Sequence, residues 1–164
     1  MNYQFTLASK NEIQAIFHLY EQRVQWMDNK NIQQWNTTYY LEAYPIDYYY
    51  DQQINKCLYV LKNQEKIKGA VCLFENDERW PNQVNAYYIH NLVTDINEKG
   101  AGKVILSNIE QMAIQNNKQR LRLDCAIDNK FLNQYYERLG YKIAGTCQEG
   151  CYQGNLREKK LGSD

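Results

Sequence analysis

The sequence predicts a mixed α/β fold: a central, largely antiparallel sheet with one parallel pair of strands, and helices on both faces. Residues 84–94, 97–113 and 120–127 read as a strand, a glycine turn with a helix, and a second strand. Two strands joined through a helix lie parallel, with a right-handed crossover. Hairpin signals flank this unit at residues 56–75 and 141–161, and hairpins add antiparallel neighbours.

The composition describes an ordinary globular protein. Of the 164 residues, 44% are hydrophobic and 23% charged, and no linker-like segment interrupts them, so we expect one domain over residues 1–164. Nineteen basic residues balance nineteen acidic ones without a basic stripe, which argues against a nucleic-acid partner. No stretch has the apolar length of a membrane span, and the first residues lack a signal-peptide core. We expect no membrane partner and a cytoplasmic location.

The cysteines also favour the cytoplasm, because their number, five, is odd and does not fit a framework of paired disulfides. Cys57, Cys72 and Cys125 lie in strand-like runs, where a free thiol packs as a small apolar side chain. Cys147 and Cys151 are close in sequence, but no second pair or nearby histidine completes four ligands. We therefore expect no metal site.

The first third of the chain predicts a strand, a helix and an aromatic segment. Residues 3–9 read as the strand, and residues 9–12 form a capping box that opens the helix. A polar turn at residues 27–31 leads into residues 32–54, where we expect short helices broken near Pro45. The apolar face of the first helix comprises Ile13, Ile16, Phe17, Tyr20 and Val24.

The apolar residues then change to the spacing of strands. Residues 56–62 and 66–75 form a hairpin through a polar turn, and residues 84–94 form a long strand. The helix after the glycine turn returns to helical spacing. Its apolar residues are Ile105, Leu106, Ile109, Met112 and Ala113.

The last third predicts a strand, a helix and a hairpin. In residues 120–127, apolar side chains alternate with mostly polar ones, and in residues 129–140 they recur at helical spacing until Gly140 ends the helix. Residues 141–148 and 154–161 close the chain as a hairpin. The second of these strands offers an edge for pairing between subunits, so the expected state is a monomer or a homodimer.

The glycine turn is the strongest chemical signal. Two of the eight glycines, Gly100 and Gly102, stand before a helix, where open backbone N–H groups bind anions. The turn is not a P-loop, because Val104 follows Gly102-Lys103 and Asn97 stands where a glycine is required. It is not a dinucleotide fingerprint either, because Ile105 replaces the third glycine.

Two motifs carry a family resemblance. The run Asn97-Glu98-Lys99-Gly100-Ala101-Gly102 resembles the pyrophosphate loop, Gln/Arg-x-x-Gly-x-Gly/Ala, of the GNAT superfamily of acetyl-CoA-dependent N-acetyltransferases. Asn97 replaces the usual Arg or Gln, and Lys99 stands nearby as an alternative charge. The resemblance covers nearly all of the chain, most specifically residues 84–142, and is closest to small bacterial members. The second signature of the family is matched by Asn129, Leu132, Tyr136, Glu137, Arg138, Gly140 and Tyr141.

The resemblance implies that acetyl-CoA is the donor and that the acceptor is a primary amine of a small molecule or a peptide. The pantetheine arm is then expected between strands 84–94 and 120–127, which splay apart in this family, with Asn129 touching it from one side. Asn is also a preferred helix-capping residue, and Asn129 can have both roles together. Backbone at Leu92, Val93 and Thr94 would pair with the arm. Backbone N–H groups would hold the pyrophosphate at Lys99, Gly100, Ala101, Gly102, Lys103 and Val104.

Direct attack of an amine on a thioester needs an acid, oxyanion donors and a base. The resemblance gives Tyr136 as the acid for the departing thiolate, although an aromatic residue in an apolar helix stripe is usually core. Backbone N–H near Val93 suits the oxyanion. His90 is the candidate base, because imidazole readily accepts a proton near neutral pH. Glu21 or a chain of water molecules are the alternatives.

The acceptor side is expected in the first helices and the loop after them. An aromatic and acidic wall suits a small cationic amine, but packing of short helices on the sheet is the commoner reason for such a cluster of rings. A non-catalytic module that binds or senses acyl-CoA is the rival function, favoured by Asn97. The wall comprises Trp26, Trp35, Tyr39, Tyr40, Tyr44 and Tyr48–Tyr50, with Asp28, Glu42, Asp47 and Asp51 nearby.

Overall fold

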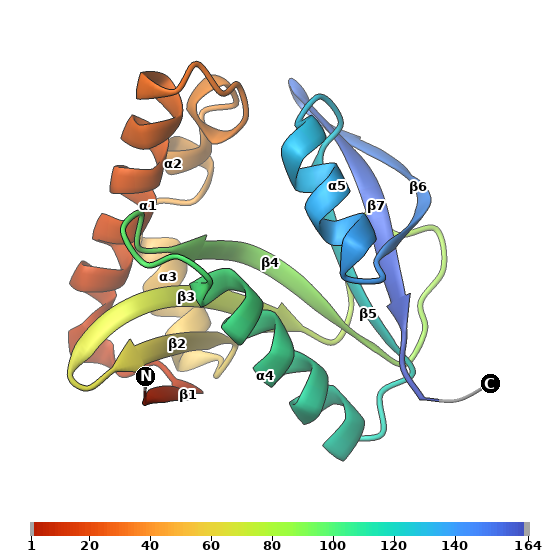
Figure 1. Ribbon diagram of the computed structural model, residues 1–164, viewed down its shortest axis with the longest axis horizontal. Coiled ribbons are helices and arrows are strands. Elements are labelled where there is room, and N and C mark those ends of the chain that lie inside the picture. Colours follow the sequence, from red (N-terminus) through yellow and green to blue (C-terminus); the bar gives the residue numbers. More distant parts are fainter. Residues whose placement is uncertain (1, 163–164) are drawn as a thin grey trace. The chain divides into compact units, whose positions relative to one another are not determined.

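The computed structural model describes residues 2–162 and contains one seven-stranded sheet, in the order β1-β2-β3-β4-β5-β7-β6 (Figure 1). The β1–β2, β2–β3, β5–β7 and β6–β7 ladders are antiparallel, and the β4–β5 ladder is parallel. This confirms the predicted mixed, largely antiparallel fold. The strands are β1 (Tyr3–Leu7), β2 (Leu58–Asn63), β3 (Lys66–Phe74), β4 (Ala86–Thr94), β5 (Arg120–Ala126), β6 (Lys142–Glu149) and β7 (Tyr152–Lys160).

Contacts divide the chain into two compact units. The first unit runs to Leu73 and includes Asn91–Asn108; the second contains Phe74–His90 and the described residues from Ile109 onward. Strand β4 and helix α4 (Ala101–Gln115) contribute to both units. The single domain over residues 1–164 stays a prediction.

The first unit begins as its sequence predicts. Ser9 N–H donates to Glu12 Oε1 at 2.9 Å, and a 3-10 turn, η1 (Lys10–Glu12), precedes helix α1 (Ile13–Asn29). The turn predicted over residues 27–31 starts three residues too early: α1 continues to Asn29, with Met27, only 6% exposed, on its buried face, and the turn follows at residues 30–31.

The aromatic segment forms short helices, with the break at Pro45 that the sequence predicts. These are η2 (Trp35–Thr37), α2 (Tyr40–Ala43) and α3 (Ile46–Ile54). Their rings stack against one another and against α1: the centroids of Trp35 and Tyr40 lie 4.2 Å apart, and those of Tyr20 and Tyr49 lie 4.6 Å apart. Aromatic packing is therefore established for this segment.

The second unit holds β5, β7 and β6, with α5 (Lys130–Arg138) in contact with β5 and β6 (Figure 1). The parallel ladder is short and pairs Ala86–Tyr88 with Arg120–Arg122. Because β7 lies between β5 and β6, the expectation that residues 154–161 form a sheet edge is wrong; β6 is the edge strand at that end of the sheet.

Arg122 departs from the alternation predicted for β5. This polar residue is only 3% exposed, because its guanidinium donates to Glu158 Oε2 at 2.7 Å and to the Tyr88 hydroxyl at 3.0 Å. It also lies 4.1 Å from the centre of the Trp80 ring. A buried charge with this many partners is satisfied, so both faces of β5 are covered.

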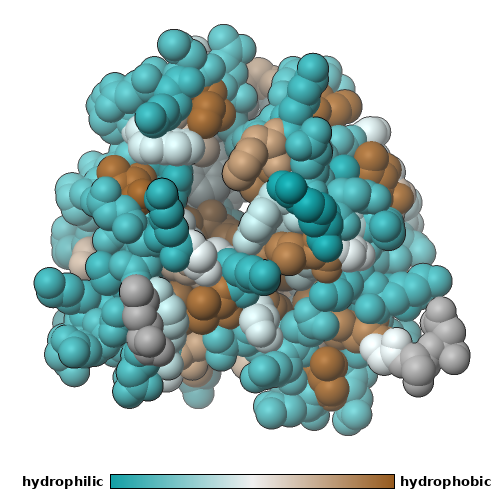
Figure 2. All heavy atoms as spheres, in the orientation of Figure 1, coloured by the Kyte–Doolittle hydropathy of each residue, from teal (hydrophilic) through white to brown (hydrophobic). Residues whose placement is uncertain are grey.

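The surface in Figure 2 is mostly hydrophilic, with hydrophobic residues in small separate groups. All five cysteines are free thiols, as expected, and Cys72 and Cys125 are buried. Within residues 2–162, no helix combines the length and hydropathy needed to cross a bilayer.

Candidate active site

The glycine turn lies in the first unit, at the start of α4. Gly100 has a φ of +86°, a conformation that L side chains rarely adopt, and no atom of residues 2–162, its two chain neighbours aside, lies within 4 Å of the position that a β-carbon would occupy. Gly102 differs from the sequence expectation: it lies in the first helical turn and its φ is not positive. The backbone conformation therefore requires glycine at position 100, whereas it sets no such requirement at position 102.

Two N–H groups at this helix end have no acceptor in the described part of the chain. Ala101 N–H points to the Glu98 carbonyl at 3.4 Å, and Val104 N–H points to the Gly100 carbonyl at 3.2 Å. The N–H groups of Gly102 and Lys103 remain, as expected for the first turn of an α-helix. They leave two donors for an anion.

The acidic side chain beside the turn is already neutralised. Glu98 accepts from the Tyr3 hydroxyl at 2.6 Å and lies 3.2 Å from Lys68 Nζ. These hydrogen bonds, the first above all, hold the pKa of Glu98 below its ordinary value. Lys99 and Lys103 are exposed, so the accessible side-chain charge at the turn is positive.

Strand β4 is bent at Asn91, which has a φ of +57°. Tyr20 donates to the Asn91 carbonyl, Tyr48 donates to Asn91 Oδ1 at 2.8 Å, and Asn91 Nδ2 donates to the Tyr40 hydroxyl at 2.6 Å. Asn tolerates positive φ better than most residues, and here its side chain is fixed as well. The bend immediately precedes Leu92–Thr94.

This geometry predicts an unusual order of stability at position 91. Asn91→Gly should cost about 2 kcal/mol of unfolding free energy for two lost side-chain hydrogen bonds. Asn91→Ala should cost about 1 kcal/mol more, because alanine is strained at positive φ. Urea unfolding of both variants measures the difference. In an ordinary strand, a glycine variant is less stable than an alanine variant. An Asn91→Ala protein that is more stable than Asn91→Gly would therefore contradict the bend.

One carbonyl of the expected pantetheine-binding segment already has a partner. Arg23 Nη2 donates to the Thr94 carbonyl and to Thr94 Oγ1, both at 3.0 Å. A carbonyl oxygen has two lone pairs, so one remains available at Thr94. Glu21, the alternative base, is exposed on α1 near His18, with the two side chains 3.7 Å apart.

In the second unit, α5 carries Asn129 and Tyr136. Asn129 caps the helix, because its Oδ1 accepts from the Leu132 N–H at 3.0 Å. Tyr136 is 6% exposed, and its ring packs edge-on against those of Tyr135 and Tyr141. Burial raises the pKa of the Tyr136 hydroxyl well above its ordinary value, so this group keeps its proton.

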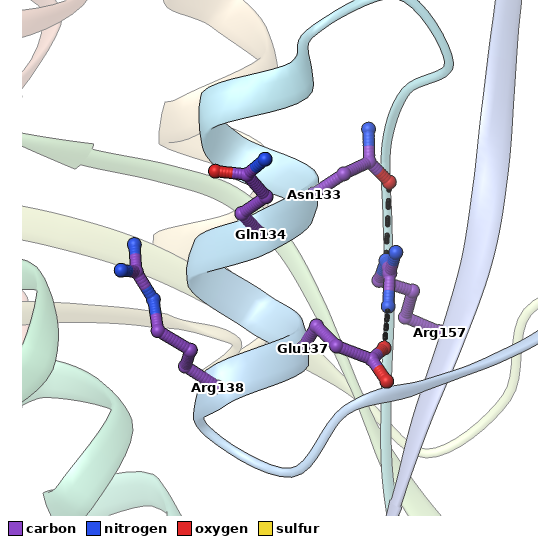
Figure 3. A pocket seen from close by; sticks show the side chains of 5 residues that line it. All are labelled: Asn133, Gln134, Glu137, Arg138 and Arg157. Carbon is purple, nitrogen blue, oxygen red and sulfur yellow. Dashed lines mark hydrogen bonds and ion pairs between the residues drawn. The ribbon is translucent and has the colours of Figure 1, made fainter.

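A hollow of about 370 Å³ lies beside α5 and is lined by four side chains of this helix and by Arg157 of β7 (Figure 3). Asn133 and Glu137 point toward Arg157, whereas Gln134 and Arg138 point away from it. Arg157 Nε donates to Asn133 Oδ1 at 3.1 Å, and its Nη1 bonds Glu137 Oε2 and the Tyr141 carbonyl, at 2.5 and 2.8 Å. This buried arginine fixes the helix that carries Tyr136.

We expect Arg157→Ala to lower the free energy of unfolding by about 3 kcal/mol, since it removes three hydrogen bonds of Arg157, including the one to the buried Tyr141 carbonyl. Arg138→Ala is the matched control, because this exposed arginine lines the same hollow; its cost should stay within about 0.5 kcal/mol. Urea denaturation compares the two variants, and equal midpoints would contradict the structural role of Arg157.

His90 lies near two carboxylates in the second unit. Its Nε2 is 2.8 Å from Asp77 Oδ2, and one polar atom each of Asp77, His90 and Asp124 lie within 4.8 Å of one another. These three side chains lie close enough together to bind one metal ion. Asp124, however, already accepts from Arg79 Nη1 at 3.2 Å and from the Tyr152 hydroxyl at 2.6 Å, so a cation would have to displace these donors.

The family to which the chain belongs follows from its similarity to known protein families. The model of the acetyltransferase (GNAT) family matches residues 26–141, more than half of the chain. The chain belongs to this family.

Individual relatives agree with the GNAT assignment. The chain is 26% identical over 115 residues to the uncharacterized N-acetyltransferase YesJ of Bacillus subtilis, an alignment that covers 63% of this chain and 61% of YesJ. A GNAT-family acetyltransferase from Listeria monocytogenes shares the fold with a TM-score of 0.79 and 19% identity, over 97% of this chain and 95% of that one. The N-acetyltransferase PaiA from Thermoplasma acidophilum, solved with coenzyme A, shares the fold with a TM-score of 0.75 and 14% identity, over 98% of this chain and 100% of that one.

The predicted GNAT site residues do not all lie in the same unit. Leu92–Thr94 and Lys99–Val104 belong to the first unit, and His90, Asn129 and Tyr136 belong to the second. The sequence reasoning missed four side chains that hold these residues: Arg23, Asn91, Asp77 and Arg157. Only Asn91 had a signal, because Asn is enriched at positive φ.

Proposed function

We propose that this GNAT protein transfers an acetyl group from acetyl-CoA to a primary amine of a small molecule or a peptide. The observation that carries the proposal is the turn before α4: Gly100 at positive φ, open space above it, and two N–H groups without acceptors. These features fit a pyrophosphate, because a helix N-terminus with open donors binds anions.

In this proposal, the turn from Lys99 to Val104 holds the donor's pyrophosphate, with the N–H groups of Gly102 and Lys103 as donors, because those of Ala101 and Val104 already bond carbonyl oxygens of the turn. Backbone at Leu92, Val93 and Thr94 pairs with the pantetheine amides, and Asn129 adds a contact besides capping α5. The coenzyme A bound to PaiA of Thermoplasma acidophilum supports a CoA ligand for this fold. Acetyl-CoA supplies a reactive thioester when bound.

The chain's own residues then have three tasks. His90 accepts the proton that the attacking amine must lose. Backbone N–H near Val93 stabilises the oxyanion, and Tyr136 gives its proton to the departing thiolate. Burial keeps the Tyr136 hydroxyl protonated at neutral pH, and a general acid must carry its proton before it can give it away.

We further propose that the acceptor binds at the aromatic segment of the first unit. Tyr39 is 72% exposed there, while most of the other rings pack on one another, so a cationic amine would meet only part of the predicted wall. The five free thiols support a cytoplasmic location. A monomer or a homodimer remains the expected state.

The rival, a non-catalytic acyl-CoA-binding module, is favoured by Asn97, which lacks the charge of the family's usual arginine. A screen of primary amines with acetyl-CoA, read by CoA release, separates the two functions. An amine that raises CoA release well above the rate without amine supports the enzyme. Acetyl-CoA binding with no responsive amine would favour the module.

A further inference from the structure

The loop between β3 and β4 gives His90 one specific partner. Both carboxylate oxygens of Asp124 already accept a hydrogen bond, Oδ1 from Arg79 and Oδ2 from the Tyr152 hydroxyl. Asp77 instead accepts the Arg79 N–H at Oδ1, at 3.0 Å, and has Oδ2 directed at His90 Nε2, at 2.8 Å. The imidazole is thus paired with Asp77 and not with the other carboxylate.

Asp77 is itself held firmly by its loop. Its N–H donates to Gln83 Oε1 at 3.3 Å, and its carbonyl accepts from Gln83 Nε2 at 2.9 Å and from the Trp80 N–H at 3.2 Å. Burial alone would raise the pKa of Asp77, but the hydrogen bonds from His90 and from the Arg79 N–H outweigh it and lower the pKa. Asp77 is therefore ionised at neutral pH.

An ionised carboxylate can only accept hydrogen bonds, so His90 must carry its hydrogen on Nε2. In the neutral ring, Nδ1 then keeps the lone pair. The side chains of His90 and Asp77 are 15% and 10% exposed, and the Phe74 ring lies 5.4 Å from the imidazole, centroid to centroid. The ring is confined, yet it remains partly open to solvent.

We infer that Asp77 is a positioning residue that fixes the Nε2–H tautomer of His90 and so presents Nδ1 as the proton acceptor. This inference rests on the proposed acetyl transfer. There, the amine nitrogen forms its bond to the acetyl carbon, the carbon–sulfur bond breaks, Nδ1 takes the amine proton, and the thiolate takes a proton from Tyr136. Other charged and titratable groups of the same cluster are Asp124, Arg79, Tyr152, Cys147 and Glu149.

The fixed loop makes Asp77→Asn a sharp test. Because the Arg79 N–H needs an acceptor at the Oδ1 position, the amide oxygen of Asn should stay there and its NH₂ group should face His90. The NH₂ group donates, so His90 Nε2 must become the acceptor and the hydrogen must move to Nδ1. The substitution therefore reverses the tautomer without changing the size of the side chain.

Nitrogen NMR of the imidazole measures this reversal directly. The chain has two histidines, so His18→Gln leaves His90 as the single imidazole signal. In the His18→Gln protein we expect His90 to carry its hydrogen on Nε2, and the control substitution Glu78→Gln, added to it, should not change this. Adding Asp77→Asn instead should move the hydrogen to Nδ1. Glu78 is the exposed neighbour that loses the same charge. Identical tautomers in the Asp77→Asn and control proteins would overturn the inference.

Kinetics with an amine from the screen tests the catalytic part. His90→Gln should lower kcat by roughly 10²–10⁴, the usual share of a general base. Asp77→Asn should lower kcat about tenfold or more with the KM for acetyl-CoA unchanged, as replacement of an orienting carboxylate does elsewhere. Glu78→Gln should match the parent protein.

An Asp77→Asn variant with the parent kcat would overturn the inference while leaving the proposed acetyl transfer intact. A parent protein that acetylates no amine would overturn both the proposed function and the catalytic role of Asp77. The tautomer measurement needs no substrate, and it still shows whether Asp77 fixes His90.

Discussion

Tyr136→Phe should lower kcat by roughly 10²–10⁴ and leave the affinity for acetyl-CoA nearly unchanged. Phenylalanine keeps the ring, which packs against Tyr135 and Tyr141, so the substitution removes only the hydroxyl. General acid catalysis typically contributes this factor, and the thiolate would otherwise leave unprotonated or depend on water. Steady-state kinetics with an amine from the screen measures kcat, and calorimetry measures donor binding.

Tyr135→Phe is the control, because it removes a hydroxyl from the adjacent, half-buried tyrosine of the same helix. It should retain the parent kcat. If Tyr136→Phe also turns over within about threefold of the parent protein, Tyr136 is a core residue and not the acid, since a loss this small falls far short of an acid's share.

Gly102→Val should weaken CoA binding by about tenfold or more, which corresponds to at least about 1.4 kcal/mol. The side chain would occupy the space beside the free N–H groups of Gly102 and Lys103. Because Gly102 is helical, the substitution should not strain the backbone, and the fold should remain at least as stable as that of the parent. Calorimetric titration with CoA gives the affinity, and thermal unfolding gives the stability.

Ser107→Val is the matched control for this substitution. Ser107 is exposed on the same helix, beyond its first turn, so its replacement adds a similar side chain away from the free donors. It should bind CoA as the parent does. A folded Gly102→Val protein with unchanged CoA affinity would remove the pyrophosphate from this turn.

Most elements of the fold could be predicted because their signals are local. Hydrophobic periodicity located the strands and helices, the capping box located the start of the first helix, and Gly140, at a φ of +96°, ends α5 as expected. The prediction was wrong where a distant contact decided the outcome. Met27 extends α1 by packing, and β7 enters the sheet beside β5 although β6 precedes it in sequence.

The candidate site could be predicted only in part, for the same reason. A glycine turn before a helix is visible in the sequence, and so is the Asn129–Tyr141 signature. The side chains that hold the site are not visible, because their partners are distant in sequence: Arg23 with Thr94, Asn91 with three tyrosines, and Arg157 with α5. Arg122 illustrates the limit, since nothing local distinguishes a buried arginine from a solvated one.

The most direct test of acetyl transfer follows the acetyl group itself. The protein is incubated with acetyl-CoA labelled in the acetyl carbon and with an amine selected by CoA release, and the label is traced by mass spectrometry. We predict that the label appears on the amine nitrogen in an amount equal to the CoA released, and that Tyr136→Phe slows its appearance. Label that remains on CoA, or that appears only as free acetate, would contradict acetyl transfer by this protein.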